Sequence, residues 1–427
     1  MTLEGAGKAD ILWRNWGTRI TSTSATTDLI TLAAHGCVVQ HLAIDNLATG
    51  DATAGSAILV TVGDGTVISD VSTQGFWIGV DIYDGAEWWV KACQIYGSVK
   101  YGIRVAHTDL PDGGDGTIYG CQIIANGVNC DAGIYWVSSG GMRVANNKIN
   151  GRSTFKHIDG IRYAAAEGIY TGILLINGNS IENYTRHGVF ITSPTVGTIN
   201  YITFTGNHFG TASTASSSIH LDGSAGASLG HISIAGNIVC GPSDGSVGAV
   251  KLNHTAGVHM AGNTINTGTK LTTRVGTNTA FRLADRRFPV FITGANTHTA
   301  TGAVNAYADL LSVTLQDVAV GDMLKMEFDA TLFGTAVGDS MYVRFMIGAT
   351  AVTQRMTLVT FPTAAAWVSV SPVCYMTVDN AGDITADTCT VKVQIAKGGG
   401  TQGNVYGSTT NSRSAFAVTN LYNTSLG

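Results

Sequence analysis

The sequence predicts an all-β chain, a parallel β-helix followed by an antiparallel β-sandwich. Three observations carry this prediction. A short phrase that begins and ends on apolar residues returns at intervals of about 27 residues, which is typical of repeat architectures. Several copies place an asparagine two positions before the closing residue. Beyond about Asn266 the phrase stops, and longer alternating runs take its place.

The phrase is too short for a helix and is surrounded by Gly, Ser, Thr and Asn, so we expect a strand that ends in a tight turn. The clearest copies are Val144–Ile149, Ile176–Ile181, Phe204–Phe209, Ile234–Val239 and Met260–Ile265. Asparagine tolerates the left-handed conformation and hydrogen-bonds nearby backbone. If successive turns stack about 4.8 Å apart, the five amides fall into register and form an internal ladder. Its members are Asn147, Asn179, Asn207, Asn237 and Asn263.

The same spacing extends the phrase backwards through four earlier turns. These copies are Leu42–Leu47, Thr66–Val71, Val90–Ile95 and Ile118–Ile123. The ladder position there would hold Asp45, Ser69, Cys93 and Cys121. The seven cysteines are odd in number and form no CxxC, so we expect free, mostly buried thiols made in a reducing compartment.

A second strand recurs midway round each turn, usually after a glycine. Because side chains alternate along a strand, its aliphatic residues point inward and the residues between them form an outward row. That row contains Asp81, Arg104, Tyr135, Arg162, Phe190, His220 and Lys251.

The chain is expected to contain three regions. Residues 1–268 form the β-helix, residues 269–288 a linker or cap, and residues 289–427 a β-sandwich for trimerisation or carbohydrate binding. The opening already looks like a β-helix turn, so we expect a preceding N-terminal part that this sequence lacks.

Composition narrows the function classes. The net charge is -5 with no basic cluster, which argues against nucleic acid as a partner. No apolar run approaches the roughly 20 residues of a membrane span. The glycine-rich turns lack the context of a phosphate-binding loop, and no cluster has metal-ligand spacing, so we expect neither cofactor nor metal.

The asparagine rows, the Leu3–Gly7 opening and the C-terminal sandwich resemble bacteriophage tailspikes and tail-fibre depolymerases, which carry a right-handed pectate-lyase-like β-helix. The resemblance is one of architecture and covers nearly the whole chain, with no catalytic signature to match. It implies a homotrimer that binds and cleaves a bacterial capsular polysaccharide or O-antigen. It also implies attachment to a phage tail or baseplate through the missing N-terminal part, with assembly in the host cytoplasm and action outside the cell.

A groove lined by aromatic and polar side chains suits a glycan, and arginine forks onto the carboxylates of acidic sugars. The predicted substrate-binding residues are Arg104, Arg162, Tyr135, Asp81, Trp88, His187 and His157. The row is equally consistent with a solvated sheet face held by Arg–Asp pairs, and the tryptophan with a trimer contact.

Glycoside hydrolysis usually needs two carboxylates, and acids are scarce in the middle turns. We predict Glu167, Asp159 and Glu182 as the acid/base set. Two patches supply these residues: Glu167 with Asp109 and His107, and a turn that contains Asp131, His157, Asp159, Glu182, Arg186 and His187. A polysaccharide lyase that uses His157, His187 or Tyr163 as the base, a glycan-binding protein without activity, and a structural fibre segment are the alternatives.

Overall fold

In this computed structural model the chain divides into two compact units, Met1–Thr279 and Ala280–Gly427. In the first unit the structure describes residues 2–5, 18–48, 51–105, 115–125, 130–137, 141–152, 154–164, 173–193, 197–210, 217–223, 227–242, 247–267 and 271–275. In the second it describes 282–284, 287–291, 297–300, 307–316, 318, 322–334, 340–348, 350–351, 356–360, 366–378, 382, 384–385, 388–399, 403–406 and 415–423.

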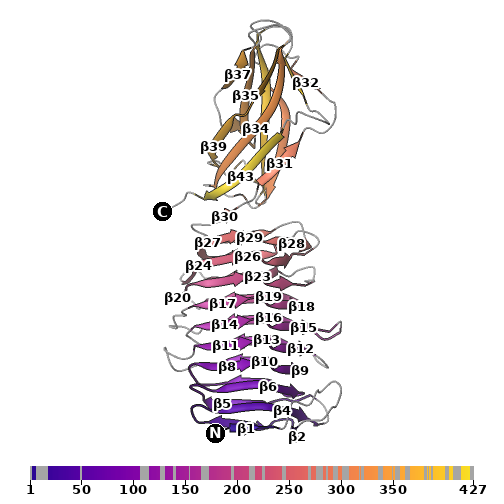
Figure 1. The fold of residues 1–427 in the computed structure, drawn as a ribbon, viewed down its shortest axis with the longest axis vertical. Helices are drawn as coiled ribbons and strands as arrows, with labels where there is room; N and C mark the ends of the chain where they lie inside the picture. Colours follow the sequence, from indigo (N-terminus) through magenta and orange to yellow (C-terminus); the bar gives the residue numbers. More distant parts are fainter. Residues whose placement is uncertain are drawn as a thin grey trace. The chain divides into compact units, whose positions relative to one another are not determined.

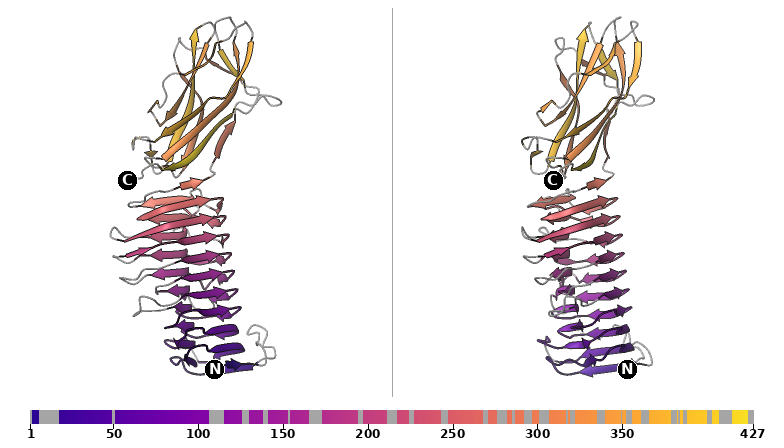
Figure 2. Two further views of the ribbon diagram at one scale, coloured as in Figure 1. Left: turned by 60° about the vertical axis from the view of Figure 1, so that its left-hand side comes forward. Right: turned by 90° about the vertical axis from the view of Figure 1, so that its left-hand side faces the viewer.

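The first unit is a parallel β-helix, which Figures 1 and 2 show as a stack of turns. Each regular turn contains three strands. The first strand row comprises β8 (Trp88–Lys91), β11 (Gly116–Tyr119), β14 (Met142–Ala145), β17 (Leu174–Asn177), β21 (Ile202–Thr205), β24 (Ala227–Ala235) and β27 (Thr255–Ala261). The second strand row comprises β9 (Gln94–Tyr96), β12 (Gln122–Ala125), β15 (Lys148–Gly151), β18 (Ser180–Glu182), β22 (His208–Phe209), β25 (Ile238–Cys240) and β28 (Thr264–Thr267). In the earlier turns β4 (Val38–Asn46) and β6 (Val67–Gln74) run through both rows, and β1 (Thr2–Glu4) and β2 (Thr18–Ser22) pair with β4.

The remaining strand of each turn belongs to a separate ten-stranded sheet, called the third sheet below. Its strands are β3 (Ile30–Ala33), β5 (Ser56–Val62), β7 (Ile78–Ile82), β10 (Tyr101–Val105), β13 (Cys130–Trp136), β16 (His157–Ala164), β19 (Tyr184–Thr192), β23 (Ser217–Asp222), β26 (Val250–Asn253) and β29 (Thr272–Val275). The predicted all-β fold, a parallel β-helix followed by antiparallel sheets, is therefore confirmed.

The asparagine ladder is confirmed, and it is continuous. The Nδ2 of each asparagine donates to the Oδ1 of the asparagine in the next turn, from Asn147 to Asn263, at 2.9–3.0 Å. Each of these Oδ1 atoms also accepts from the preceding asparagine's backbone N–H. The left-handed backbone lies one residue earlier than predicted, at Asn146 and at Gly178, Gly206, Gly236 and Gly262. This residue makes the sharp bend, and the asparagine after it hydrogen-bonds with its side chain to the backbone of the neighbouring turn.

The backward extension of the ladder is correct for two turns and wrong for the two before them. Cys121 lies in register, because its backbone N–H donates to Asn147 Oδ1, and Cys93 lies one turn earlier. The pairing of Ser72 with Gln94 places Val71 in the column instead of Ser69, and Leu42 pairs with Val71 instead of Asp45. The phrase is not visible there because β4 and β6 continue through the turn with His41 and Asp70 as the left-handed residues.

Recurring glycines determine which side chains the third sheet presents to solvent. A Cβ atom on Gly102 would lie 2.5 Å from the interior Ile123 Cγ2, and one on Gly133 would lie 2.6 Å from Ile149 Cγ2. These positions therefore face inward, as does the buried residue that follows each of them. Two consecutive inward residues leave the residues on either side of them, such as Tyr101 and Arg104, on the outside.

The second unit consists of two antiparallel sheets. One contains β31 (Arg287–Phe291), β32 (Thr297–Ala300), β34 (Asp322–Gly334), β38 (Ala366–Val370), β39 (Val373–Thr377), β42 (Gly403–Tyr406) and β43 (Ala415–Asn423). The other contains β33 (Ala308–Gln316), β35 (Ser340–Ile347), β36 (Thr350–Ala351), β37 (Met356–Thr360), β40 (Ile384–Thr385) and β41 (Thr388–Gly399). Residues of both sheets, including Met326, Phe328, Phe345 and Val391, share one buried core, which is the packing of a sandwich.

Two general findings concern the described residues. No helix among them is long and apolar enough to cross a membrane. All seven cysteines are free, and six of them are buried.

Candidate functional site

The outward side of the third sheet carries one continuous row of polar and aromatic side chains. Strand register aligns them across seven neighbouring strands, with each residue opposite the next. The row is Asp81, Arg104, Tyr135, Arg162, Phe190, His220 and Lys251, as the sequence predicts. With the outward residues beside it, this row is called the third-sheet face below.

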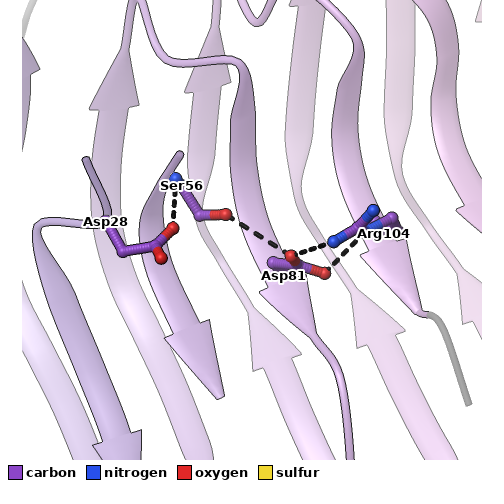
Figure 3. Close-up of polar contacts among 4 residues, drawn as sticks. All are labelled: Asp28, Ser56, Asp81 and Arg104. Carbon is purple, nitrogen blue, oxygen red and sulfur yellow. Dashed lines mark hydrogen bonds and ion pairs between the residues drawn. The ribbon is translucent and has the colours of Figure 1, made fainter. Parts of the chain in front are cut away.

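At the N-terminal end of the face, an ion pair borders a pocket of about 470 Å³ (Figure 3). Arg104 donates from Nε to Asp81 Oδ1 at 2.8 Å and from Nη2 to Oδ2 at 2.5 Å, and this bond raises the pKa of Arg104. The Ser56 hydroxyl also donates to Asp81, and the Ser56 N–H donates to Asp28 Oδ1 at 2.7 Å. Trp77 and Tyr83 add aromatic surface to the same pocket. The pocket therefore combines aromatic planes with fixed charges.

Beside the pocket, two tyrosines and two cations form a stack. The rings of Tyr101 and Tyr135 are nearly parallel, with centroids 4.4 Å apart. Lys100 Nζ lies 5.8 Å from the Tyr101 ring centroid, and the Arg162 guanidinium lies 5.7 Å from that of Tyr135. Because the tyrosines cover one face of each other, a ligand on this surface meets their edges and outer faces together with the two cations.

Two carboxylates occupy adjacent strands next to this stack. Asp159 is fully buried and accepts two hydrogen bonds from the guanidinium of Arg186. Burial raises the pKa of Asp159, and the bonds to Arg186 oppose the rise. Asp131 is partly exposed and pairs with Lys100 Nζ at 2.5 Å, and its charge also acts on Arg186. The geometry thus places two acids and three cations, with Arg162 as the third, on one surface.

Two histidines and a phenylalanine continue the face towards its C-terminal end. His220 Nδ1 and His187 Nε2 are hydrogen-bonded at 3.1 Å, and both rings contact Phe190, with centroids 5.0–5.1 Å apart. The pKa of His187 is lowered to about 3 and that of His220 to about 4, mainly by burial and in addition by the charges of Arg186 and Lys251 and, for His187, of His220. Both imidazoles are therefore neutral near pH 7.

The structure brings six of the predicted site residues together on the third-sheet face. They are Asp81, Arg104, Tyr135, Asp159, Arg162 and His187. The face also includes Trp77, Lys100 and Tyr101, which sequence reasoning missed. Tyr101 had a usable signal, because it directly precedes the recurring glycine, as Asp159 and His187 do.

Four predicted residues lie elsewhere or outside the described part. Trp88 is 1% exposed and points into the core, whereas its neighbour Trp89 is 50% exposed. His157 is fully buried opposite Cys130, and burial lowers its pKa to about 4. Glu182 lies on β18 in the second strand row, where it accepts a hydrogen bond from the Ser180 hydroxyl.

Glu167 lies outside the described residues, as do Asp109 and His107 of the same predicted patch. Within the described ranges, no group of three or more His, Cys, Asp or Glu side chains is placed to hold a metal ion.

Comparison with known proteins identifies the β-helix. Residues 56–265 match the family model described as a right-handed β-helix region. No curated protein matches the chain. The matched residues, 56–265, span the turns that carry the ladder and most of the third-sheet face.

Solved structures resemble the chain only distantly. The Agl-KA catalytic domain is similar at 12% identity and TM-score 0.42, over 65% of this chain and 58% of that one. The tailspike protein gp49 of Acinetobacter baumannii bacteriophage Fri1, a capsular polysaccharide depolymerase, is similar at 14% and 0.31, over 87% and 69%. The A-module of the Azotobacter vinelandii mannuronan C-5 epimerase AlgE4 gives 14% and 0.40, over 66% and 83%. Similarities this distant assign no activity to the chain.

Proposed function

We propose that this chain binds a bacterial surface polysaccharide, capsule or O-antigen, along the third-sheet face and cleaves it as a phage tailspike does. The observation that carries the proposal is the continuous line of ion pairs and aromatic rings on that face. Sugar hydroxyls bond to charged groups whose positions are fixed, and aromatic planes accept the apolar sides of sugar rings. Binding sites of this kind need preorganised polar groups, and the Asp81–Arg104 and Asp159–Arg186 pairs supply them.

Cleavage by hydrolysis needs two carboxylates near one glycosidic bond. Asp159 is the member of the predicted set that lies on the face, and its burial favours the protonated form that a general acid requires. Asp131 lies on the adjacent strand, one residue before Ala132, which pairs with Asp159, so the two acids come from neighbouring turns about 4.8 Å apart. In this proposal Asp131 and Asp159 share the acid and base roles, and Arg162 and Arg104 hold the substrate. Glu167 and Glu182 remain predicted candidates.

A lyase is the second candidate, because a hydrogen-bonded histidine pair lies on the face beside the cations Arg186 and Lys251. Elimination requires a base that removes the proton beside a uronate carboxylate and a cation that neutralises the carboxylate. His187 and His220 are uncharged near pH 7, and the positive charges of Arg186 and Lys251 help to lower the pKa of both. Elimination leaves a carbon–carbon double bond at the new chain end, whereas hydrolysis adds water and leaves none.

The experiment that tests the function uses purified capsule and O-antigen. Released oligosaccharides are measured by mass spectrometry, and ultraviolet absorbance detects a double bond. Asp159→Asn, Asp131→Asn, Glu167→Gln and Glu182→Gln are compared with wild type. Hydrolysis through the third-sheet face predicts loss of release in the first two variants and normal release in Glu182→Gln. Binding without release would leave a non-catalytic glycan receptor.

Assembly and location follow from the sequence resemblance and form part of the same proposal. A homotrimer attached to a phage tail or baseplate would present several third-sheet faces to one polysaccharide. Light scattering at micromolar concentration tests the trimer, and a monomeric mass would remove this part of the proposal without affecting the site.

A further inference from the structure

The C-terminal part of the third-sheet face differs in charge from the rest of it. Three cations of the face are paired, Arg104 with Asp81, Lys100 with Asp131 and Arg186 with Asp159. Arg162 and Lys251 form no ion pair with any carboxylate in the part of the chain that the structure describes, although the charge of Arg162 acts on Asp159 on the same strand. The stretch from Arg162 to Lys251 contains the Arg186–Asp159 pair and two further cations, and it therefore carries a net positive charge.

Unsatisfied hydrogen-bonding groups lie within this stretch. Among the residues that the structure describes, Arg162 Nε and His220 Nε2 are buried and have no hydrogen-bond partner. His187 and His220 are 9% and 7% exposed, so bulk water meets little of either ring. A buried polar group without a partner destabilises the protein, and a ligand that supplies the partner recovers that free energy.

The histidine pair leaves one ring nitrogen free. A neutral imidazole has one donor and one acceptor nitrogen, and the bond between His187 and His220 uses one donor and one acceptor. His187 also forms a hydrogen bond with the backbone of Ser217, so His220 Nε2 is the ring nitrogen of the pair that remains free. A sugar hydroxyl both donates and accepts, so it can bind this nitrogen whether or not the nitrogen carries the proton.

We propose that Arg162, His187, Phe190, His220 and Lys251 form a subsite for an acidic saccharide segment. Carboxylates of the sugar bind Arg162 and Lys251, a hydroxyl binds His220 Nε2, and the apolar side of a ring packs on the part of Phe190 that the Arg186 guanidinium, 4.8 Å from the ring centroid, leaves uncovered. Arg162 and Lys251 are three strand intervals apart, about 14 Å at about 4.8 Å per interval. This inference rests on the proposed function and names its substrate class, an anionic polysaccharide.

Isothermal titration calorimetry, which measures the affinity of acidic oligosaccharides for the full chain, tests the inference. The probes are hexasaccharides of galacturonate, mannuronate and α2,8-linked sialate, each paired with its carboxyl-reduced form. We expect wild type to bind at least one acidic probe at least about tenfold more tightly than its reduced form, because a hydrogen bond to a charged group contributes that much affinity. Binding should weaken as salt concentration rises.

Variants assign the binding to this stretch. Arg162→Gln and Lys251→Gln should each weaken binding of the acidic probe by about tenfold or more and leave the reduced form unaffected. His220→Phe should weaken both forms by a similar factor, about two- to tenfold, because the lost contact is to a hydroxyl. The matched control is Arg143→Gln, an exposed arginine on the first strand row, which should bind like wild type. Circular dichroism and the melting temperature verify that each variant is folded.

Failure of the subsite and failure of the proposed function give different results. The subsite is overturned if no acidic probe binds, if the acidic and reduced forms bind equally, or if Arg162→Gln and Lys251→Gln bind like wild type. If those variants still depolymerise capsule normally, cleavage at the third-sheet face stands, and Arg162 is removed from the substrate-binding residues together with the subsite. If the acidic probe binds as expected but no polysaccharide is cleaved, the subsite stands and the depolymerase proposal fails.

Discussion

Replacement of Asn207 by alanine tests whether the asparagine ladder holds the β-helix together. The Asn207 side chain takes part in four hydrogen bonds inside the barrel, where the residue is 1% exposed. Nδ2 donates to the Ile176 carbonyl at 2.8 Å and to Asn237 Oδ1 at 2.9 Å. Oδ1 accepts from the backbone N–H and from Nδ2 of Asn179, both at 3.0 Å. Asn207→Ala removes all four.

The expected loss of stability depends on which hydrogen bonds the former partners of Asn207 keep. The Asn179 side chain still donates to the Val144 carbonyl, and Asn237 Oδ1 still accepts from the Asn207 N–H. The backbone N–H of Asn179 loses the partner that the ladder provides. One orphaned buried donor costs about 1–3 kcal/mol and each of the three further lost bonds about 1 kcal/mol, which gives about 4–6 kcal/mol in total.

Asn263→Ala is the matched control, because Asn263 ends the ladder and is only half-buried. Its side chain takes part in three bonds, and water can replace part of them, so we expect a loss of about 1–2 kcal/mol. Equilibrium urea unfolding followed by tryptophan fluorescence measures both variants, since Trp88 and Trp136 are buried reporters inside the β-helix. If Asn207→Ala destabilised the protein no more than Asn263→Ala, the ladder would not be a source of stability.

Three further predictions concern the interior and the face. Gly133→Ala should destabilise the protein by about 1–3 kcal/mol because its Cβ would lie 2.6 Å from Ile149 Cγ2 and 2.7 Å from a backbone oxygen; a urea midpoint equal to that of wild type would contradict the packing explanation. Because the folded pKa of His157 is lowered to about 4, its contribution to stability is complete above about pH 6.5 and is lost as the pH falls towards 4. The contribution of His157 to the unfolding free energy should therefore fall by about 2–3 kcal/mol between pH 7 and pH 4.5, measured as the difference between wild type and His157→Gln, because His187 and His220 also have lowered pKa values. An unchanged slope in the variant would exclude His157 as a source. Asp81→Asn should lower stability by about 2 kcal/mol, because Arg104 loses its carboxylate and is itself partly exposed; a melting temperature equal to that of wild type would show that the pair contributes nothing.

Much of the fold was predictable because stacked turns impose a spacing on the sequence itself. Each turn must return to the same column, so an inward amide recurs beside a glycine or asparagine, and the phrase from Val144 to Ile265 shows it directly. The outward row of the third sheet follows from the alternation of side chains along a strand. In the first turns the prediction failed because β4 and β6 carry no glycine to mark the corner, and Val71 occupies the column in place of Ser69.

The tertiary structure alone decided which chemistry-bearing side chains meet. In sequence Trp88 and Trp89 are equivalent, but Gly116 leaves room for one indole inside and Trp89 remains outside. The sequence predicted Asp159 and Glu182 in one turn of the site. Glu182 lies on β18 in the second strand row, whereas Asp159 lies on β16 in the third sheet and binds Arg186. Sequence spacing records how often the chain returns to a column. It does not record on which side of the corner a carboxylate lies, because that depends on the backbone angles of a few turn residues.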